Sequence, residues 1–324
     1  MIINNSQINT YNSQNFNGKI IDSHTHCGKW INNKFSTNDV LEIFHKRYNN
    51  GKDKLEKVII SNLDCIINNH KAQPYKNEIQ GNLILLKECL KNDKLIPLVV
   101  CQPGFGCAEN IELLLKTYPN LIKGLKFHPA CLNIPADDIR YIPYMKLAEQ
   151  YKKPCLFHCE VVTKDNGSII RGGVSDPKRI YETARQFPKV PVILGHMGLG
   201  GEKSHKAGIN TLINSIENGD ANLYADLAWV DWANPEKPHI IEAIRRLSNT
   251  SKGDKTERLL FGTDAPLGVF GEQALKQPNA YGENIQNIKQ AIKNNFGSDA
   301  DKLISRIFYR NSKNLFKIQL DKKV

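Results

Sequence analysis

The chain has 324 residues, 40% of them hydrophobic, which is enough for one large domain with a sizeable core or for two ordinary ones. Its formal net charge of +11 comes from lysines scattered among acidic residues, without the basic, aromatic-rich stripe of a nucleic-acid groove binder. The sequence contains no run of about 18 apolar residues, which argues against a membrane span. Its polar, Asn-rich start lacks the pattern of a secretory signal. We therefore expect a cytoplasmic protein that binds neither nucleic acid nor membranes.

Residues 1–18 are predicted to form a polar extension, and residues 19–324 a single domain. Within the domain, short apolar and β-branched runs recur about 25 to 40 residues apart, the repeat expected of a strand–helix unit. The eight predicted strands are Lys19–Ser23, Lys57–Ser61, Leu95–Cys101, Leu121–Phe127, Pro154–Phe157, Val190–Leu194, Asn222–Asp226 and Arg258–Phe261.

Helical patterns lie between these strands. Ser36 or Thr37 can cap the first helix, and Asp176-Pro177 opens a later one with proline at an early position, where its missing N–H costs nothing. The predicted helices cover residues 37–48, 79–90, 111–118, 136–151, 177–187, 209–217, 235–247, 285–295 and 302–316.

Strands that alternate with helices imply a parallel sheet covered on both faces. The first strand is followed by Asp22-Ser23-His24-Thr25-His26 rather than by the Gly-rich phosphate loop that a doubly wound sheet would favour. Eight units close a barrel more naturally than they extend an open sheet. The predicted fold class is therefore α/β, a (β/α)₈ TIM barrel; the resemblance described below assigns it to the metal-dependent hydrolase type.

Potential metal ligands stand at the carboxyl ends of several predicted strands. His24 and His26 end the first strand, His158 the fifth and His196 the sixth, while Asp264 follows the eighth. In a barrel these ends share one face, where active sites are built. Residues i and i+2 of a strand project to the same side, so both imidazoles of the first strand can reach one ion. Each histidine alone would more often be a satisfied core residue, but their convergence favours a metal site.

The motifs around these residues, in this order, resemble the amidohydrolase superfamily. Within it they are most similar to the amidohydrolase-2 branch, which is related to aminocarboxymuconate semialdehyde decarboxylase. The resemblance spans about residues 19 to 318 and rests on Ile21-Asp22-Ser23-His24-Thr25-His26, Phe157-His158, Val192-Ile193-Leu194-Gly195-His196-Met197-Gly198, Leu260-Phe261-Gly262-Thr263-Asp264-Ala265-Pro266 and the closing Tyr309-Arg310-Asn311-Ser312-Lys313-Asn314-Leu315-Phe316.

The resemblance implies that His24, His26, His158 and Asp264 hold a metal ion, with His196 beside them. Three imidazoles and one carboxylate suit zinc. The ion can lower the pKa of its water from about 15.7 to about 7, and this zinc-activated water would attack an amide, lactone or ester of a small molecule. Asp264 would accept the proton, and His196 would orient the water or stabilise the oxyanion.

Lys126 on the fourth strand leaves the number of metals open. In some members of the superfamily a carboxylated lysine at this place bridges two metals, and Lys126 to Ala130 is similar to a segment of dihydroorotase. One zinc per chain is the expectation, and two if Lys126 is carboxylated, with His196 and His158 as ligands of the second. Otherwise Lys126 contacts the substrate or an acidic neighbour. A homodimer would fit the resemblance.

Three further residues are candidate substrate contacts. Arg171 lies on the long, glycine-containing segment between Val161 and Ser175, where it could clamp a substrate carboxylate or be solvated. Trp229 could line the pocket or pack under a loop. His128 could contact the substrate or be packed beneath its loop.

Other functions remain open at this stage. The same constellation supports non-oxidative decarboxylation of a small unsaturated or aromatic carboxylic acid, and release of carbon dioxide without hydrolysis would identify that reaction. A metal-binding barrel without activity is disfavoured because every ligand position is filled. A TatD-type nuclease is disfavoured because Gly124-Leu125-Lys126 stands where an acidic motif is expected.

Overall fold

Parallel strands that curl into a barrel form the centre of this computed structural model, which describes residues 18–30, 33–47, 53–66, 74–163, 169–199, 202–232, 234–266 and 280–319. Apart from Gly18, the predicted extension lies outside the described residues. The sheet of the described residues runs in the order β11-β10-β9-β6-β5-β4-β3-β1-β2. All pairs are parallel except that of β1 with β2. The strands are β1 (Lys19–Trp30), β2 (Asn33–Phe35), β3 (Lys54–Asn62), β4 (Leu95–Val100), β5 (Gly124–Phe127), β6 (Cys155–Phe157), β9 (Val192–Leu194), β10 (Leu223–Asp226) and β11 (Leu259–Leu260).

Backbone hydrogen bonds between β1 and the segment after β11 close the sheet. The Ser23 amide donates to the Phe261 carbonyl at 2.9 Å, and the Asp264 amide donates to the His24 carbonyl at 2.7 Å. Thr25 and Ala265 form a parallel bridge beside them. The predicted (β/α)₈ barrel is therefore confirmed, and each predicted strand coincides with an observed parallel strand.

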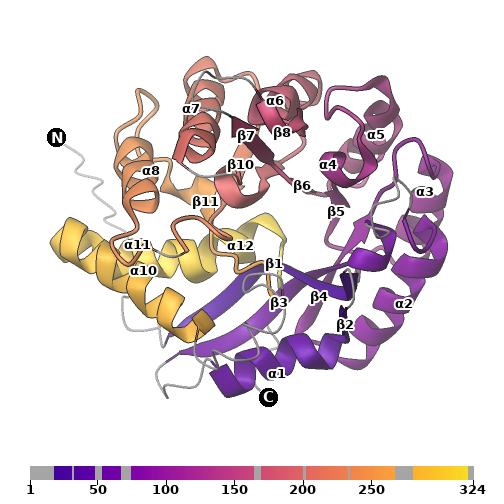
Figure 1. Cartoon of the computed structure of the whole chain (residues 1–324), viewed down its shortest axis with the longest axis horizontal. Coiled ribbons are helices and arrows are strands. Elements are labelled where there is room, and N and C mark those ends of the chain that lie inside the picture. Colours follow the sequence, from indigo (N-terminus) through magenta and orange to yellow (C-terminus); the bar gives the residue numbers. More distant parts are fainter. Residues whose placement is uncertain are drawn as a thin grey trace, which may run out of the picture.

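Helices surround the strands, and in Figure 1 the sequence colours run round the ring until α10 lies near α1. Ser36 caps α1, because its amide donates to Asp39 Oδ2 at 2.7 Å while its hydroxyl accepts from the Asp39 amide at 3.1 Å. The α-helices are α1 (Thr37–Arg47), α2 (Glu78–Lys91), α3 (Ala108–Thr117), α4 (Pro129–Leu132), α5 (Ile142–Gln150), α6 (Pro177–Gln186), α7 (Glu202–Asn218), α8 (Pro238–Ser248), α10 (Ala280–Phe296), α11 (Ala300–Ser305) and α12 (Asn311–Leu315). The short helical turns are η2 (Leu63–Cys65), η3 (Ile139–Tyr141), η4 (Gly195–Met197), η5 (Thr256–Arg258), η6 (Gly297–Asp299) and the π-helical η7 (Arg306–Arg310).

The barrel has a large core between strands and helices and a smaller one inside the strands. The inner core is closed at one end by Phe316 and Ile318, which follow α12. Its strand residues are Ile21, Ile59, Ile96, Leu98, Leu156, Ile193 and Leu260. Because side chains alternate along a strand, Lys126, between the outer-core residues Leu125 and Phe127, projects into the barrel.

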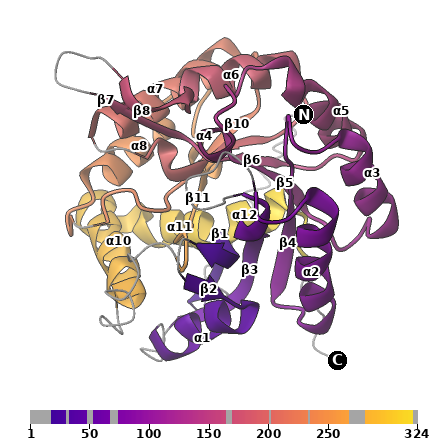
Figure 2. The same ribbon diagram turned by 45° about the vertical axis from the view of Figure 1, so that its right-hand side comes forward.

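The structure differs from the predicted elements at several points. The helix predicted from residue 136 begins only at Ile142, as α5. The segment expected as a long loop, Val161 to Ser175, contains an antiparallel hairpin of β7 (Glu160–Thr163) and β8 (Ile169–Ser175), which contacts α6 and α7 (Figure 2). The last predicted helix is interrupted by η7, and α7 begins at Glu202 rather than at Ile209. In the part of the chain that is described, no helix is both long and apolar enough to cross a membrane.

Candidate metal centre

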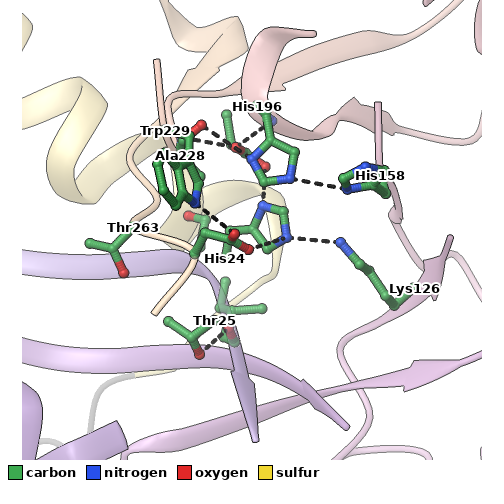
Figure 3. Close-up of polar contacts among 12 residues, drawn as sticks. His24, Thr25, Lys126, His158, His196, Ala228, Trp229 and Thr263 are labelled. Carbon is green, nitrogen blue, oxygen red and sulfur yellow. Dashed lines mark hydrogen bonds and ion pairs between the residues drawn. The ribbon is translucent and has the colours of Figure 1, made fainter. Parts of the chain in front are cut away.

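The five residues expected at the metal site lie at the same end of the barrel, each less than a tenth exposed. His24 and His26 lie on β1, which continues past Ser23 because it pairs with β3 as far as Cys27 and then with β2 from Gly28. His158 follows β6, His196 lies in η4 after β9, and Asp264 follows β11 (Figure 3). These five residues therefore lie together, as their positions at the ends of the strands predicted.

Three of these residues form a set that matches a metal ion in geometry. Oδ1 of Asp264 lies 3.0 Å from Nε2 of His26 and 3.5 Å from Nε2 of His24. Two ligand atoms about 2.0 to 2.1 Å from a tetrahedral ion lie about 3.3 Å apart, so these separations fit zinc.

Hydrogen bonds fix the ring of His24 in the form that a metal requires. Nδ1 of His24 lies 2.9 Å from Oδ2 of Asp226, and because an ionised carboxylate only accepts, Nδ1 carries the proton. The lone pair of Nε2 then accepts from Lys126 Nζ at 2.8 Å, and Oδ1 of Asp264 lies 3.5 Å from the same nitrogen. In His26, Nε2 shares its proton with Oδ1 of Asp264 at 3.0 Å. Ser61 Oγ lies 2.8 Å from Nδ1, where the hydroxyl could accept the ring proton if an ion replaced the proton on Nε2.

His158 and His196 form a second pair of donors. Nδ1 of His196 contacts the carbonyl of Ala228 at 3.2 Å, and Nε2 of His158 contacts Oε2 of Glu160 at 3.3 Å. Because both partners are acceptors, both of these nitrogens carry the protons. The remaining nitrogens, His158 Nδ1 and His196 Nε2, then face each other with lone pairs at 3.2 Å.

Either one ring adopts the other tautomer and donates to its neighbour, or a cation lies between the two lone pairs. Burial, together with His158 and Lys126, lowers the pKa of His196 to about 3 although Asp264 opposes the shift, so a proton is a poor candidate. A metal ion suits the pair better. His158 thus lies with His196 and is not grouped with His24, His26 and Asp264, so the arrangement is compatible with one ion or with two.

Lys126 occupies the centre of the site. Its side chain is fully buried, and its Nζ lies 2.8 Å from Nε2 of His24. Burial lowers the pKa of Lys126 to about 8, although Asp264 and Asp226 oppose the shift. An ammonium that donates to the Nε2 lone pair and a metal ion at that lone pair exclude each other, so Lys126 has to move or change its charge when the site is filled.

Two buried aspartates that sequence reasoning missed organise the site. Asp226 ends β10, and its Oδ1 accepts from the His196 amide at 2.9 Å and from the Ala228 amide at 3.1 Å. Asp22 accepts from the His24 amide at 3.1 Å and from the Thr263 hydroxyl at 2.6 Å. Burial raises the pKa of each carboxyl to about 7. The rule used for the histidines would have found Asp226, because it ends the predicted seventh strand.

His24, His196 and Asp226 also have ligand atoms within 4.8 Å of one another. Both oxygens of Asp226, however, already accept hydrogen bonds from N–H groups. Asp226 therefore supports the candidate ligands and is a poorer candidate ligand than Asp264. Asp264 keeps Oδ1 for an ion, which favours the group of His24, His26 and Asp264.

The candidate substrate contacts have different surroundings. His128 begins α4, where its Nδ1 accepts from the Cys131 amide at 3.2 Å, and its ring stacks on His158 with centroids 3.9 Å apart. Trp229 donates from Nε1 to Oδ2 of Asp264 at 2.9 Å. Arg171 lies on β8, but its side chain is outside the described residues.

Comparison with known proteins identifies the family. The profile of the Amidohydro_2 family, described as amidohydrolase, matches residues 89–318. Since this is more than half of the chain, the protein belongs to this amidohydrolase family. Comparison with curated protein sequences finds no match.

Proteins with solved structures of the same fold are named for different reactions. A probable 2-pyrone-4,6-dicarboxylic acid hydrolase of Acinetobacter baumannii is 13% identical, with a TM-score of 0.57 over 92% of this chain and 99% of that one. A 5-carboxyvanillate decarboxylase of Sphingomonas paucimobilis is 11% identical, with a TM-score of 0.55 over 93% and 100%. A 4-oxalomesaconate hydratase of Rhodopseudomonas palustris is 13% identical, with a TM-score of 0.55 over 92% and 95%. At these identities the likeness shows the fold alone.

Proposed function

We propose that the protein is a metal-dependent hydrolase that cleaves an amide, lactone or ester bond of a small molecule. The observation that carries this proposal is the geometry of His24, His26 and Asp264, whose donor atoms converge at the distances expected around one zinc ion. Their position at the carboxyl ends of the barrel strands agrees with where such barrels bind substrates.

In this proposal His24, His26 and Asp264 hold zinc, with His158 as a fourth ligand or as part of a second site with His196. Zinc would supply the Lewis acidity that polarises a substrate carbonyl and makes a water molecule acidic enough to attack it near neutral pH. The residues of the chain bind and orient the reactants around it.

Asp264 is the best-placed proton acceptor. Burial raises its pKa, but His196, His26 and Lys126 outweigh that effect and lower it to about 2, so Asp264 is ionised at neutral pH. His196 presents a neutral Nε2 to the same space, where it can orient the attacking water. Lys126, when protonated, can stabilise negative charge that develops on the substrate oxygen.

Elemental analysis of protein purified without chelators tests the metal centre. About one zinc per chain, lost in His24→Ala and kept in Lys126→Ala, is the expected result for a single site. Two ions per chain, one of them lost in Lys126→Ala, would instead indicate a bridged pair. Absence of bound metal under all conditions would contradict the proposal.

Decarboxylation of a small unsaturated or aromatic carboxylic acid is the second candidate, and Lys126 is the observation that favours it. A fully buried cation beside His24 can pair with a substrate carboxylate. The similar structures include a decarboxylase that acts on 5-carboxyvanillate. Panels of lactones, esters, amides and aromatic acids, assayed in parallel for acid release and for carbon dioxide, separate the two reactions.

A further inference from the structure

Trp229 gives the two oxygens of Asp264 different partners. Its indole N–H donates to Oδ2 at 2.9 Å, while Oδ1 faces the Nε2 atoms of His26 and His24 (Figure 3). The carboxylate comes from the segment after β11 and the indole from the loop after β10. Two neighbouring strand ends therefore meet in this one hydrogen bond.

The loop that carries Trp229 is anchored on the side of α10. Lys237 is fully buried, and its Nζ donates to the carbonyl of Asp231 at 2.7 Å, to that of Trp232 at 3.2 Å and to Oδ1 of Asn284 on α10 at 2.7 Å. The ring of Trp232 lies 5.7 Å from that of Trp229 and contributes to the same packing.

The loop is also anchored to α8. Oδ2 of Asp231 accepts from the backbone amides of His239 at 2.8 Å and Ile240 at 3.1 Å, in the first turn of that helix. Trp229 and Asp231 have φ values of 65° and 52°, which residues with a Cβ seldom adopt. These contacts stabilise a backbone conformation that the loop would seldom adopt by itself. In this conformation the indole N–H of Trp229 points at Asp264.

We propose that Trp229 is a positioning residue that restricts Asp264 to binding a metal ion through Oδ1 alone, an inference that rests on the metal centre proposed above. An aspartate can bind a cation through one or both oxygens. If Oδ2 turned to the ion, its hydrogen bond with the partly buried indole N–H would lengthen or break, which costs free energy. Binding through one oxygen keeps the coordination number low, which leaves room for water or substrate.

Cobalt(II) substitution tests this restriction, because the visible absorption of this ion becomes weaker as its coordination number rises. Protein stripped with a chelator is titrated with Co²⁺ as wild type, as Trp229→Phe, and as Trp232→Phe, the control for loss of a neighbouring indole. In Trp229→Phe we expect weaker absorption per bound ion, with affinity about 10- to 100-fold lower. The spectrum of Trp232→Phe should match that of the wild type.

The spectrum decides between the outcomes. An unchanged spectrum in Trp229→Phe overturns the inference, whether or not affinity falls, because the indole would then only stabilise the loop. A weaker spectrum supports it. If the wild-type chain itself binds no Co²⁺ or Zn²⁺, the proposed metal centre fails, which is a different result.

A second measurement needs no change at Trp229. In protein with ¹⁵N-labelled tryptophan, Trp30→Phe and Trp232→Phe assign the remaining indole signal by elimination. We expect the Trp229 indole N–H to stay protected from solvent exchange when Zn²⁺ is added, because its bond to Oδ2 persists. Loss of protection on loading would show that Oδ2 has turned to the ion, and it would overturn the inference.

Discussion

Asp226 connects three groups of the metal centre through its two oxygens. Oδ2 accepts from His24 Nδ1, and Oδ1 accepts from the amides of His196 and Ala228. The same carboxylate therefore sets the tautomer of one ring and the backbone position of another. Outer partners of this kind are part of a metal site, since they decide which nitrogen offers its lone pair.

Replacing Asp226 with Asn should block the His24 position. The amide oxygen has to stay with the two backbone N–H donors, so the NH₂ group would face Nδ1 of His24. That nitrogen would then have to accept, and the ring proton would move to Nε2, where the metal is expected to bind. We expect zinc affinity, measured by competition with a chromophoric chelator, to fall about 10- to 100-fold.

Asp220→Asn is the matched control for this change. Asp220 precedes β10 and is part of a surface ion pair with Arg185, far from the metal centre along the strand. Its substitution should leave zinc affinity as in the wild type. If Asp226→Asn binds zinc as tightly as the control, the tautomer argument is wrong.

The sequence predicted which residues would gather at the candidate metal centre, but not the partners of their side chains. A histidine at a strand end is visible in the sequence, and alternation along a strand predicts that His24 and His26 share a side. Which acceptor each ring meets depends on contacts between residues as distant as His24 and Asp226, and on side-chain rotamers. For the same reason the pairing of His158 with His196 could not be predicted, and their roles as ligands stay predictions.

At the scale of elements, a tight turn positions His196. In η4 both His196 and Met197 adopt left-handed backbone conformations, with φ of 62° and 47°. Helix α7 packs directly against this turn at Gly208, where an added Cβ would lie 2.1 Å from the Met197 carbonyl oxygen. The absence of a side chain at Gly208 therefore allows the helix to support the turn.

Gly208→Ala should destabilise the protein although alanine favours a helix. The new methyl group would meet a backbone oxygen that cannot move without shifting the turn, so we expect a loss of about 1 to 3 kcal/mol in the free energy of unfolding. Urea denaturation measures it. Asn214→Ala, on the exposed face of the same helix, should change stability by less than about 0.5 kcal/mol. Equal effects at the two positions would contradict this account of the turn.

The burial of Lys237 should make the stability of the protein depend on pH. Burial lowers its pKa from 10.5 to about 8, so between these values the unfolded chain binds more protons than the folded one. The free energy of unfolding therefore rises with pH across this window. Lys237→Met removes the contribution, so the wild type should gain stability relative to the variant between about pH 8 and about pH 10 in urea denaturation. A constant difference would show that Lys237 does not titrate in this way.

The hairpin β7–β8 shows why some elements were missed. Val161-Val162-Thr163 and Ile169-Ile170 are β-branched runs on either side of Asn166-Gly167, which is a hairpin signal. The glycines at 172 and 173 weaken the strand pattern, so a loop was predicted for this segment. By contrast, the barrel strands were predicted because each is a short buried run, a pattern that depends little on tertiary context.

At the scale of the whole molecule, the metal centre lies at the seam of the barrel. His24 and His26 belong to the first strand, and Asp264 follows the last, 238 residues after His26. Eight strand–helix repeats predicted that a barrel would close, but not that closure would align these side chains. That alignment depends on the register of β1 against the segment after β11, which backbone hydrogen bonds such as that of Asp264 with His24 determine.

If the proposed ligands at the two ends of the barrel hold an ion, metal binding should stabilise the entire fold. A ligand that binds only the folded state at 100 times its Kd adds about 2.7 kcal/mol. In a domain of this size each kcal/mol raises Tm by about 2 °C, so saturating zinc should raise Tm by about 5 °C over chelator-treated protein. Differential scanning calorimetry with and without zinc measures the shift.

His26→Ala should abolish the zinc-dependent shift, whereas His239→Ala should keep it. His239 is a histidine of another cluster, paired with Asp231 at 2.6 Å, so its loss can lower Tm but leaves the metal ligands intact. A shift that persists in His26→Ala would mean that zinc stabilises the fold from a different place. A shift lost in His26→Ala but kept in His239→Ala would show that the zinc which stabilises the fold is bound through His26, at the place where β1 meets the segment after β11.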